Sequence, residues 1–212
     1  MLTSRLMTDL ERVGAIMLDS HFVYTSGRHG TAYINKDAVY PHHRLVRTIT
    51  ELMASRSPWD VDVVAGPVVG GVILSTWVAQ HLSHSGRVSR DVLSVYADKD
   101  ESGGFVFKRG YDRLLIGRKT LIVEDVVNTG GSLKKTVRAA RLCGADVIGA
   151  IALCNRGGIT AEFLGVPAFS SLLDLPLVTF AEDDCHLCEH GVPINVSVGK
   201  GAEFLRRKAV QM

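Results

Sequence analysis

The sequence lacks a long hydrophobic run and has no large excess of charge of either sign. The uncharged stretch 63–80 is interrupted by Gly66, Pro67, Gly70 and Gly71, and it is short for a membrane span. The first residues, MLTSRLMTDLER, carry charges where a secretory signal needs an apolar segment. Lysine and arginine number 24, aspartate and glutamate number 22, and the net charge is +2. We therefore expect no nucleic-acid partner and no membrane partner.

Cysteine is also scarce. Four cysteines in 212 residues do not make a disulfide framework, so we expect reduced thiols in a soluble, cytoplasmic protein. The segment Cys185-His186-Leu187-Cys188, followed by His190, contains the residue types that bind metals. A single C-x₂-C without a second pair is a weak zinc signal. We expect a loop with ordinary thiols here, and a structural zinc site is the alternative.

The rest of the composition is that of an ordinary globular protein. Hydrophobic residues make up 46% of the chain and charged residues 22%, which suits one domain, with or without a small flap. Helical spacing of apolar residues predicts a first helix within residues 4–18 and a second from Pro41 to about Ser57-Pro58. Residues 22–35 place β-forming residues on both sides of a Ser-Gly-Arg-His-Gly turn, which indicates a loop or hairpin.

From residue 61 onward, short apolar strands alternate with helices. We expect strands at Val61–Ala65, Val92–Tyr96, Thr120–Val123 and Val147–Leu153, and helices at Val72–Leu82 and Ser132–Cys143. This order is typical of an α/β fold with a parallel sheet that helices cover on both faces. Such sheets bind ligands in the loops at the carboxyl ends of their strands, and the glycine-rich loops 66–71 and 128–131 follow strands in this way.

The connection 98–117 is long and charged, and it contains Gly103-Gly104 between β-forming segments. A protruding β-ribbon fits this pattern better than a structureless coil. Charged excursions beside a ligand edge are often lids, and the alternative is a surface hairpin without a role in catalysis.

The segment 121–133 is the most informative. An apolar strand ends in Glu124 and Asp125, and a small-residue turn leads into the next helix. Backbone N–H groups of the glycines, with the hydroxyls of Thr129 and Ser132, would form a site for a phosphate monoester at the helix start. The two carboxylates would suit ribose hydroxyls or a metal ion held by them, whereas the alternative is that they cap a helix or solvate an edge. A Walker A loop and the G-x-G-x-x-G fingerprint are both absent.

These thirteen residues resemble the signature of type I phosphoribosyltransferases that binds phosphoribosyl pyrophosphate (PRPP). The resemblance implies a parallel sheet flanked by helices, a small hood from residues 1–40 and the C-terminal segment, a core at about 60–155, and a β-ribbon that forms a mobile catalytic loop at 98–117. It implies that Glu124 and Asp125 bind the ribose hydroxyls. The other residues that it assigns to PRPP are Asn128, Thr129, Gly130, Gly131 and Ser132 for the 5-phosphate, and Gly66, Pro67, Gly70 and Gly71 for the pyrophosphate.

The segment 22–35 is similar to the hood of orotate phosphoribosyltransferases, which begins with an aromatic residue, three further residues and Ser-Gly-Arg. The resemblance implies a base site that includes Ser26, Tyr33, Ile34 and Arg156. A guanidinium offers a bidentate fork to the orotate carboxylate, and a surface ion pair is the alternative role for Arg156.

The chain departs from the family pattern at three places. Thr25 and Gly70 stand where a lysine is common, and Lys99 is the only base in the first arm of the catalytic loop. Lys108 and Arg109, on the return arm, are candidates to supply the missing positive charge to PRPP.

The expected reaction is transfer of the 5-phosphoribosyl group from PRPP to orotate, which gives orotidine 5′-phosphate and pyrophosphate. We expect Lys99, Glu124 and Asp125 to be catalytic, and Mg²⁺ to be held through substrate oxygens near the two acids. The family's loop reaches a neighbouring subunit, so the resemblance also implies a homodimer. The alternatives are a transferase for a purine or other base, and a PRPP-binding regulator.

Overall fold

The computed structural model describes residues 2–57, 60–86 and 90–211. The chain forms two compact units. The first unit combines the residues up to 39 with those from 177 onward, and the second unit contains residues 40–176. No helix in the described ranges is long and apolar enough to cross a membrane.

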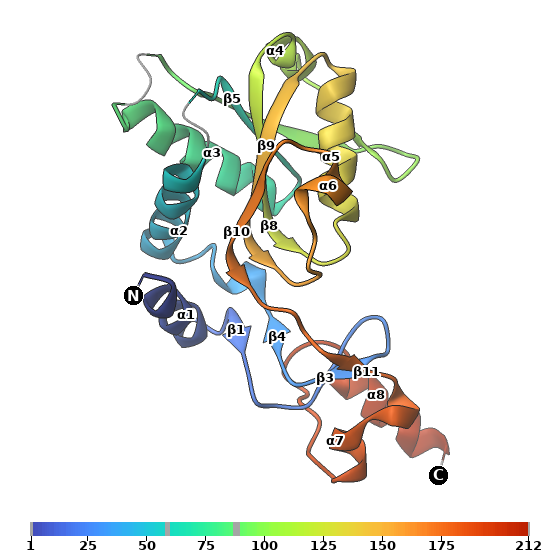
Figure 1. Ribbon diagram of the computed structural model, residues 1–212. Helices are drawn as coiled ribbons and strands as arrows, with labels where there is room; N and C mark the ends of the chain where they lie inside the picture. The colour runs from blue at the N-terminus through green and yellow to red at the C-terminus, as the bar shows by residue number, and fades with distance from the viewer. Residues whose placement is uncertain (1, 58–59, 87–89, 212) are drawn as a thin grey trace. The chain divides into compact units, whose positions relative to one another are not determined.

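The second unit is built on a six-stranded sheet within the described part of the chain (Figure 1). Neighbouring strands are parallel except for the last pair, β6 and β7. The strands, in their order across the sheet, are β10 (Phe169–Asp174), β9 (Asp146–Asn155), β8 (Lys119–Val127), β5 (Val63–Pro67), β6 (Leu93–Lys99) and β7 (Phe105–Val106). The fold class is therefore the predicted one, an α/β fold with a mainly parallel sheet.

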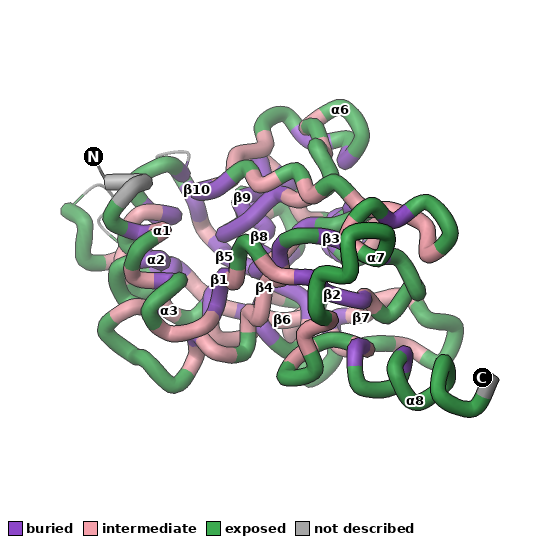
Figure 2. The backbone as a smooth tube through the Cα atoms, turned by 90° about the horizontal axis from the view of Figure 1, so that it is seen from below, coloured by how far each residue is buried: buried purple, intermediate pink, exposed green. Residues whose placement is uncertain are grey.

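Helices cover both faces of this sheet. In Figure 1, α2 (His43–Arg56) and α3 (Gly70–His84) lie on one side, and α5 (Gly131–Leu142) lies on the other. Strand β8 is consequently buried from Thr120 to Asp125. In Figure 2, where buried residues are purple, the tube is purple in the central strands of this sheet. A strand buried on both faces is apolar at successive positions rather than at alternate ones. Two further short helices are α4 (Tyr111–Leu115) and α6 (Ala161–Leu164).

The four predicted strands are confirmed, each with slightly different ends, and β10 is a parallel strand that we did not predict. The first predicted helix was too long. Helix α1 spans Leu2–Arg12, and Gly14 follows with a φ of 72°, a left-handed conformation that ends a helix. Ile16–Met17 then form strand β1. The second predicted helix ends at Arg56, and Pro58 lies outside the described residues.

The predicted β-ribbon is present, but it is shorter than the range 98–117. Strands β6 and β7 pair antiparallel with Asp98 opposite Val106 and Lys99 opposite Phe105. Phe107 is then buried in the core, which fixes the chain and ends the ribbon. Gly110, with a φ of 82°, precedes α4, so Tyr111–Leu115 of the predicted range are helical.

The first unit combines helix α1 with two-residue strands and further helices from the two ends of the chain. Strands β1 and β4 (Tyr33–Ile34) form an antiparallel pair, and β11 (Thr179–Phe180), β3 (His29–Gly30) and β2 (Phe22–Val23) form a three-stranded sheet. The remaining elements are the 3₁₀ helices η1 (Lys36–Ala38) and η2 (Glu182–Asp184) and the helices α7 (His186–Glu189) and α8 (Gly201–Gln211). The residues from 22 to 35 thus contain the hairpin that the sequence indicated.

The burial of β8 generates a prediction with a matched control. Leu121 is 1% exposed on β8, whereas Leu142, at the end of α5, is 78% exposed. We expect Leu121→Ala to lower the free energy of unfolding by about 2–5 kcal/mol, because it removes packed methyl groups and leaves a cavity. Leu142→Ala should change it by less than about 0.5 kcal/mol. Urea denaturation followed by circular dichroism measures both, and equal effects would contradict the burial of β8.

Candidate active site

The two predicted acids lie at the carboxyl end of β8 and face different neighbours. Glu124 and Asp125 are each 6% exposed. Because successive side chains of a strand point to opposite faces, the two carboxylates separate. Glu124 lines a pocket formed with the loop that follows the strand, whereas Asp125 accepts a hydrogen bond from the Tyr40 hydroxyl at 2.8 Å. The pair therefore lies between the loop that follows β8 and the loop that joins β5 to α3.

The first of these loops forms a small cavity of about 130 Å³. It contains all five residues predicted to hold the 5-phosphate, and its lining residues are Glu124, Val126, Val127, Asn128, Thr129, Gly130, Gly131, Ser132 and Leu133. Gly130 has a φ of 72° and directly precedes α5. The N–H groups of the first turn of α5, which have no partner within the helix, therefore lie at the cavity. Backbone donors at a helix N-terminus favour an anion.

The second loop joins β5 to α3, and its glycines allow the chain to approach itself closely. A Cβ atom at Gly66 would lie 2.7 Å from the Gly71 Cα, which real Cβ atoms do not do. A Cβ atom at Gly70 would overlap Asp125 Oδ2 and the Tyr40 hydroxyl. The lysine that is common at position 70 in the resembled family has no room here. Tyr40 and Asp125 occupy that space instead.

The end of β9 lies against the first loop. The backbone N–H groups of Arg156 and Gly157 donate to the Val127 carbonyl at 2.8 and 3.3 Å. Asn155 is buried, and its side chain exchanges two hydrogen bonds of 3.0 Å with the Ile159 backbone, which closes the following turn. The half-buried Arg156 is therefore carried next to the strand end that bears Glu124 and Asp125.

The ribbon residues are placed differently from the acids. Lys99 is exposed at the end of β6. Lys108 and Arg109 lie between β7 and α4 rather than on a return strand. Arg109 forms an ion pair with Asp98, which raises the pKa of the guanidinium. The predicted role of Arg109 in charge neutralisation would require this pair to open.

The turn of the ribbon is well defined and contacts α5. Asp100 accepts hydrogen bonds from the Ser102 hydroxyl at 2.7 Å and from the Gly104 N–H at 2.7 Å, and these bonds hold the pKa of Asp100 below its usual range. Lys135 on α5 donates to the Gly103 carbonyl at 2.7 Å. The ribbon tip therefore lies against α5 in this structure.

The predicted base-binding residues Ser26, Tyr33 and Ile34 belong to the first unit. Ser26 is exposed at the tip of the β2–β3 hairpin, where Gly27 has a φ of 78°. Tyr33 and Ile34 form β4 and are half-buried. The Tyr24 and Tyr33 rings stack with centroids 6.4 Å apart.

Two residues of the site were missed by sequence reasoning. Tyr40 precedes α2 and is far in sequence from Asp125, so only a three-dimensional structure pairs them. Gly157 is the second, because a Cβ atom there would overlap the Asn128 carbonyl. The glycine directly after Arg156 was the available signal, since glycine often marks a close approach of two backbone segments.

Comparison with known proteins finds a matching domain and similar chains. The model of the phosphoribosyl transferase domain matches residues 35–163. The orotate phosphoribosyltransferase of Thermotoga maritima is 35% identical over 193 residues, which are 91% of this chain and 96% of that protein.

Solved structures show the same fold. The structure of Mycobacterium tuberculosis H37Rv orotate phosphoribosyltransferase with Fe(III) dicitrate has a TM-score of 0.65 and 24% identity, and the match covers 82% of this chain and 97% of that one. The structure of the same protein with PRPP has a TM-score of 0.61 and 23% identity, and the match covers 82% and 97% of the two chains.

The crowding at Gly70 generates a prediction that needs no substrate. We expect Gly70→Ala to lower the free energy of unfolding by about 1–3 kcal/mol, because the new methyl group forces Asp125 and Tyr40 apart. Gly131→Ala is the matched control, since Gly131 also begins a helix and its Cβ would meet only Thr129 Oγ1 at 3.5 Å. That control should be neutral or stabilising by up to about 1 kcal/mol. Equal losses in urea titrations of the two variants would show that space at Gly70 is not limiting.

Proposed function

The chain belongs to the orotate phosphoribosyltransferases, and we propose that its second unit binds PRPP across the end of β8 while the ribose is transferred to orotate. The observation that carries this proposal is the placement of Glu124 and Asp125 between two glycine-rich loops. PRPP has a phosphate at one end, a pyrophosphate at the other and ribose hydroxyls between them. Its three polar parts match the order of loop, acids and loop.

The 5-phosphate would bind in the cavity of residues 128–132, with backbone N–H groups and the hydroxyls of Thr129 and Ser132 as donors. The pyrophosphate would bind at Gly66, Pro67, Gly70 and Gly71. Glu124 and Asp125 would accept hydrogen bonds from the ribose hydroxyls. Tyr40 would hold the Asp125 carboxylate in position through the bond of 2.8 Å.

The residues present fit a magnesium ion that is held mainly by the substrate. Mg²⁺ prefers oxygen ligands and keeps several waters, so it needs only one or two carboxylates from the protein. Glu124 and Asp125 are the acids at the proposed ribose site, and they would bind the ion directly or through the hydroxyls. The ion would supply positive charge to the leaving pyrophosphate.

In the reaction, a ring nitrogen of orotate releases its proton and forms a bond to C1 of the ribose as the C1–oxygen bond to pyrophosphate breaks. Pyrophosphate leaves with the electron pair, and positive charge develops on the ribose ring, which the carboxylates of Glu124 and Asp125 would stabilise. Lys99, with Lys108 or Arg109, would neutralise the leaving group once the ribbon closes. A closed ribbon would also exclude water, which would otherwise hydrolyse PRPP.

Arg156 of the second unit would recognise orotate, and the roles of Ser26, Tyr33 and Ile34 in base binding stay predictions from the sequence resemblance. The orotate carboxylate matches the two parallel N–H donors of a guanidinium. We further propose that the protein acts as a cytoplasmic homodimer in pyrimidine nucleotide biosynthesis. Its four cysteines are free thiols, which suits a reducing compartment.

The direct test is a pyrophosphate-release assay with Mg²⁺, PRPP and a panel of bases. We expect release with orotate and none with adenine, guanine or hypoxanthine. Binding of PRPP in calorimetry without turnover on any base would instead support a regulator.

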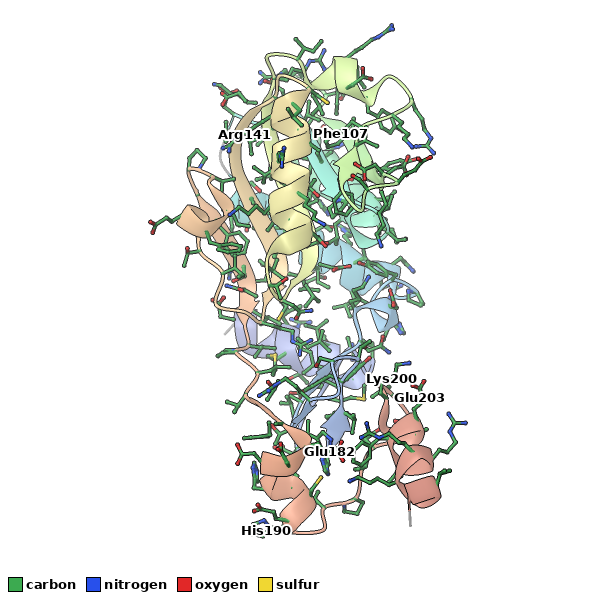
Figure 3. The ribbon with its side chains drawn as sticks, turned by 90° about the vertical axis from the view of Figure 1, so that its right-hand side faces the viewer. Phe107, Arg141, Glu182, His190, Lys200 and Glu203 are labelled. Atoms are coloured by element: carbon green, nitrogen blue, oxygen red, sulfur yellow. The ribbon has the colours of Figure 1, made fainter. Side chains whose placement is uncertain are left out.

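Arg156 provides a prediction on base specificity. We expect Arg156→Ala to lower kcat/KM for orotate by about 10- to 150-fold, because it removes a charged hydrogen-bonding partner of the carboxylate. The dissociation constant for PRPP should change little, as calorimetry would measure. Arg141→Ala is the matched control, because the exposed Arg141 on α5 donates only to the Gly165 carbonyl at 2.6 Å in the described structure (labelled in Figure 3). A PRPP defect as large as the orotate defect would contradict the assigned role.

The proposed dimer provides a prediction on the ribbon. Lys99→Ala and Asp125→Asn should each be nearly inactive alone. If the ribbon serves the partner's site, a mixed dimer of the two variants contains one site with both native residues. Random reassociation should then restore about a quarter of wild-type activity. A mixture that stays inactive after unfolding and refolding together would show that the ribbon acts within its own subunit, or that no dimer forms.

A further inference from the structure

Four side chains of metal-binding types converge in the first unit, and none of them is a residue assigned to PRPP. The atoms His21 Nε2, His29 Nδ1, Cys185 Sγ and Cys188 Sγ all lie within 4.8 Å of one another. Among the residues that the structure describes, this is the one such group. We propose that these four residues bind a structural zinc ion, which joins the two ends of the chain in the first unit.

The distances between the atoms suit one tetrahedral ion. Zinc–nitrogen bonds of about 2.0–2.1 Å and zinc–sulfur bonds of about 2.3 Å place nitrogen and sulfur ligands roughly 3.5 Å apart at a tetrahedral centre. The nitrogen–sulfur distances here are 3.4 Å for His29 with Cys188, and 3.6 and 3.8 Å for His21 with Cys185 and Cys188. The two ring nitrogens are 2.8 Å apart and need to separate by roughly half an ångström around the ion.

The surroundings of the two histidines hold their rings in the required orientation. His21 Nδ1 lies 2.9 Å from the Val192 carbonyl, which can only accept a hydrogen bond. Nδ1 therefore carries the proton, and the lone pair of Nε2 points toward the two sulfur atoms. A second hydrogen bond from the outer ring nitrogen is the usual support of a metal-binding histidine. The His29 ring packs edge-on against Phe204, with centroids 4.9 Å apart.

Charge and burial also agree with zinc. His21 and His29 are fully buried, Cys185 is 1% exposed, and Cys188 is the most exposed of the four. Two neutral imidazoles and two thiolates match the charge of one Zn²⁺, and the complex is then neutral. A buried charge without such compensation is costly.

The chemistry of the group argues against a catalytic cysteine. Cys185 is 1% exposed, whereas a nucleophilic thiol must be accessible to its substrate. Four protein ligands also fill a tetrahedral site and leave no open position for a substrate, which is typical of structural zinc.

The first unit has a structural need for such a crosslink. Its sheets are made of strands of two residues, and its elements come from both ends of the chain. His29 lies on the central strand β3, His21 directly precedes β2, and the two cysteines flank the start of α7. Units of this size rarely contain enough buried apolar surface and often rely on a metal or a disulfide.

The zinc alternative raised from the sequence was therefore incomplete. His190 is exposed and its Nδ1 donates to the His186 carbonyl at 2.7 Å, so it does not join the group (Figure 3). The second ligand pair is His21 and His29. His21 precedes Cys185 by 164 residues, so a search for a compact motif does not find this pair.

Metal content of the full-length wild-type chain tests the proposal without any variant. We expect native mass spectrometry and plasma emission spectrometry to find about one zinc per chain. Modification of the thiols with a mercurial reagent should release that zinc to a chromogenic chelator. Chain stripped of metal and titrated with Co²⁺ should show the visible absorption of tetrahedral cobalt together with thiolate-to-cobalt charge transfer.

Variants locate the ion. Cys185→Ser with Cys188→Ser should reduce zinc to a small fraction of one equivalent, and His29→Ala should weaken zinc retention during dialysis against a chelator. Cys143→Ser and His190→Ala are matched controls that remove a thiol and an imidazole outside the group, and both should keep one zinc. If the double cysteine variant does not fold, the wild-type cobalt spectrum still decides.

Three results would overturn the proposal: a wild-type chain that takes up neither zinc nor cobalt, zinc retained in the double cysteine variant, or a Cys185–Cys188 disulfide seen as the loss of two hydrogens in the purified chain. None of these results depends on transferase activity, so a failure here leaves the proposed function intact.

Discussion

The site depends on one constraint, the alternation of side chains at the end of a fully buried strand. Glu124 and Asp125 are neighbours in sequence, yet β8 directs them to opposite faces. One carboxylate meets the cavity of residues 128–132, and the other meets Tyr40 and the turn at Gly70. The acids can therefore take their proposed roles between two glycine-rich loops only if β8 stays in register, and its burial between helices on both faces of the sheet keeps it there.

Close backbone approach is the second requirement, and it explains why the chain departs from its family at Gly70. A side chain at this position would need the space that Asp125 Oδ2 and the Tyr40 hydroxyl occupy. The chain thus has a fixed carboxylate where a relative could have a cation. In the proposed reaction, positive charge for the pyrophosphate must then come from elsewhere. Lys99 is exposed on the ribbon, while Arg109 is paired with Asp98, so Arg109 would have to leave Asp98 to supply that charge.

The sequence predicted the parts of the molecule that depend on local pattern. Apolar runs such as 121–123 identify buried strands, and the acids with their glycine turn mark the loop that lines a cavity, because each signal lies within a few residues. The sequence did not predict contacts between distant segments. Tyr40 meets Asp125 across 85 residues, and His21 meets Cys185 across 164, and no periodicity records such pairs. Helix α1 was overextended for a different reason, since the apolar spacing continued past Gly14 although the backbone did not.

The proposed zinc site and the proposed base site share one hairpin. His21 and His29 flank the segment that contains β2 and the turn with Ser26, and Arg28 in that turn donates to Thr179 Oγ1 at 2.7 Å. The tip of this hairpin, residues 25–28, is exposed, whereas Phe22 and Val23 of β2 are buried. The conformation of this exposed tip therefore depends on the strands that carry it, where the two histidines lie. An ion bound there would order the turn that presents Ser26 without touching any substrate, because it removes the freedom of the hairpin before orotate binds. Metal binding would in this way contribute to base recognition through preorganisation, and the chemistry at β8 would be unaffected.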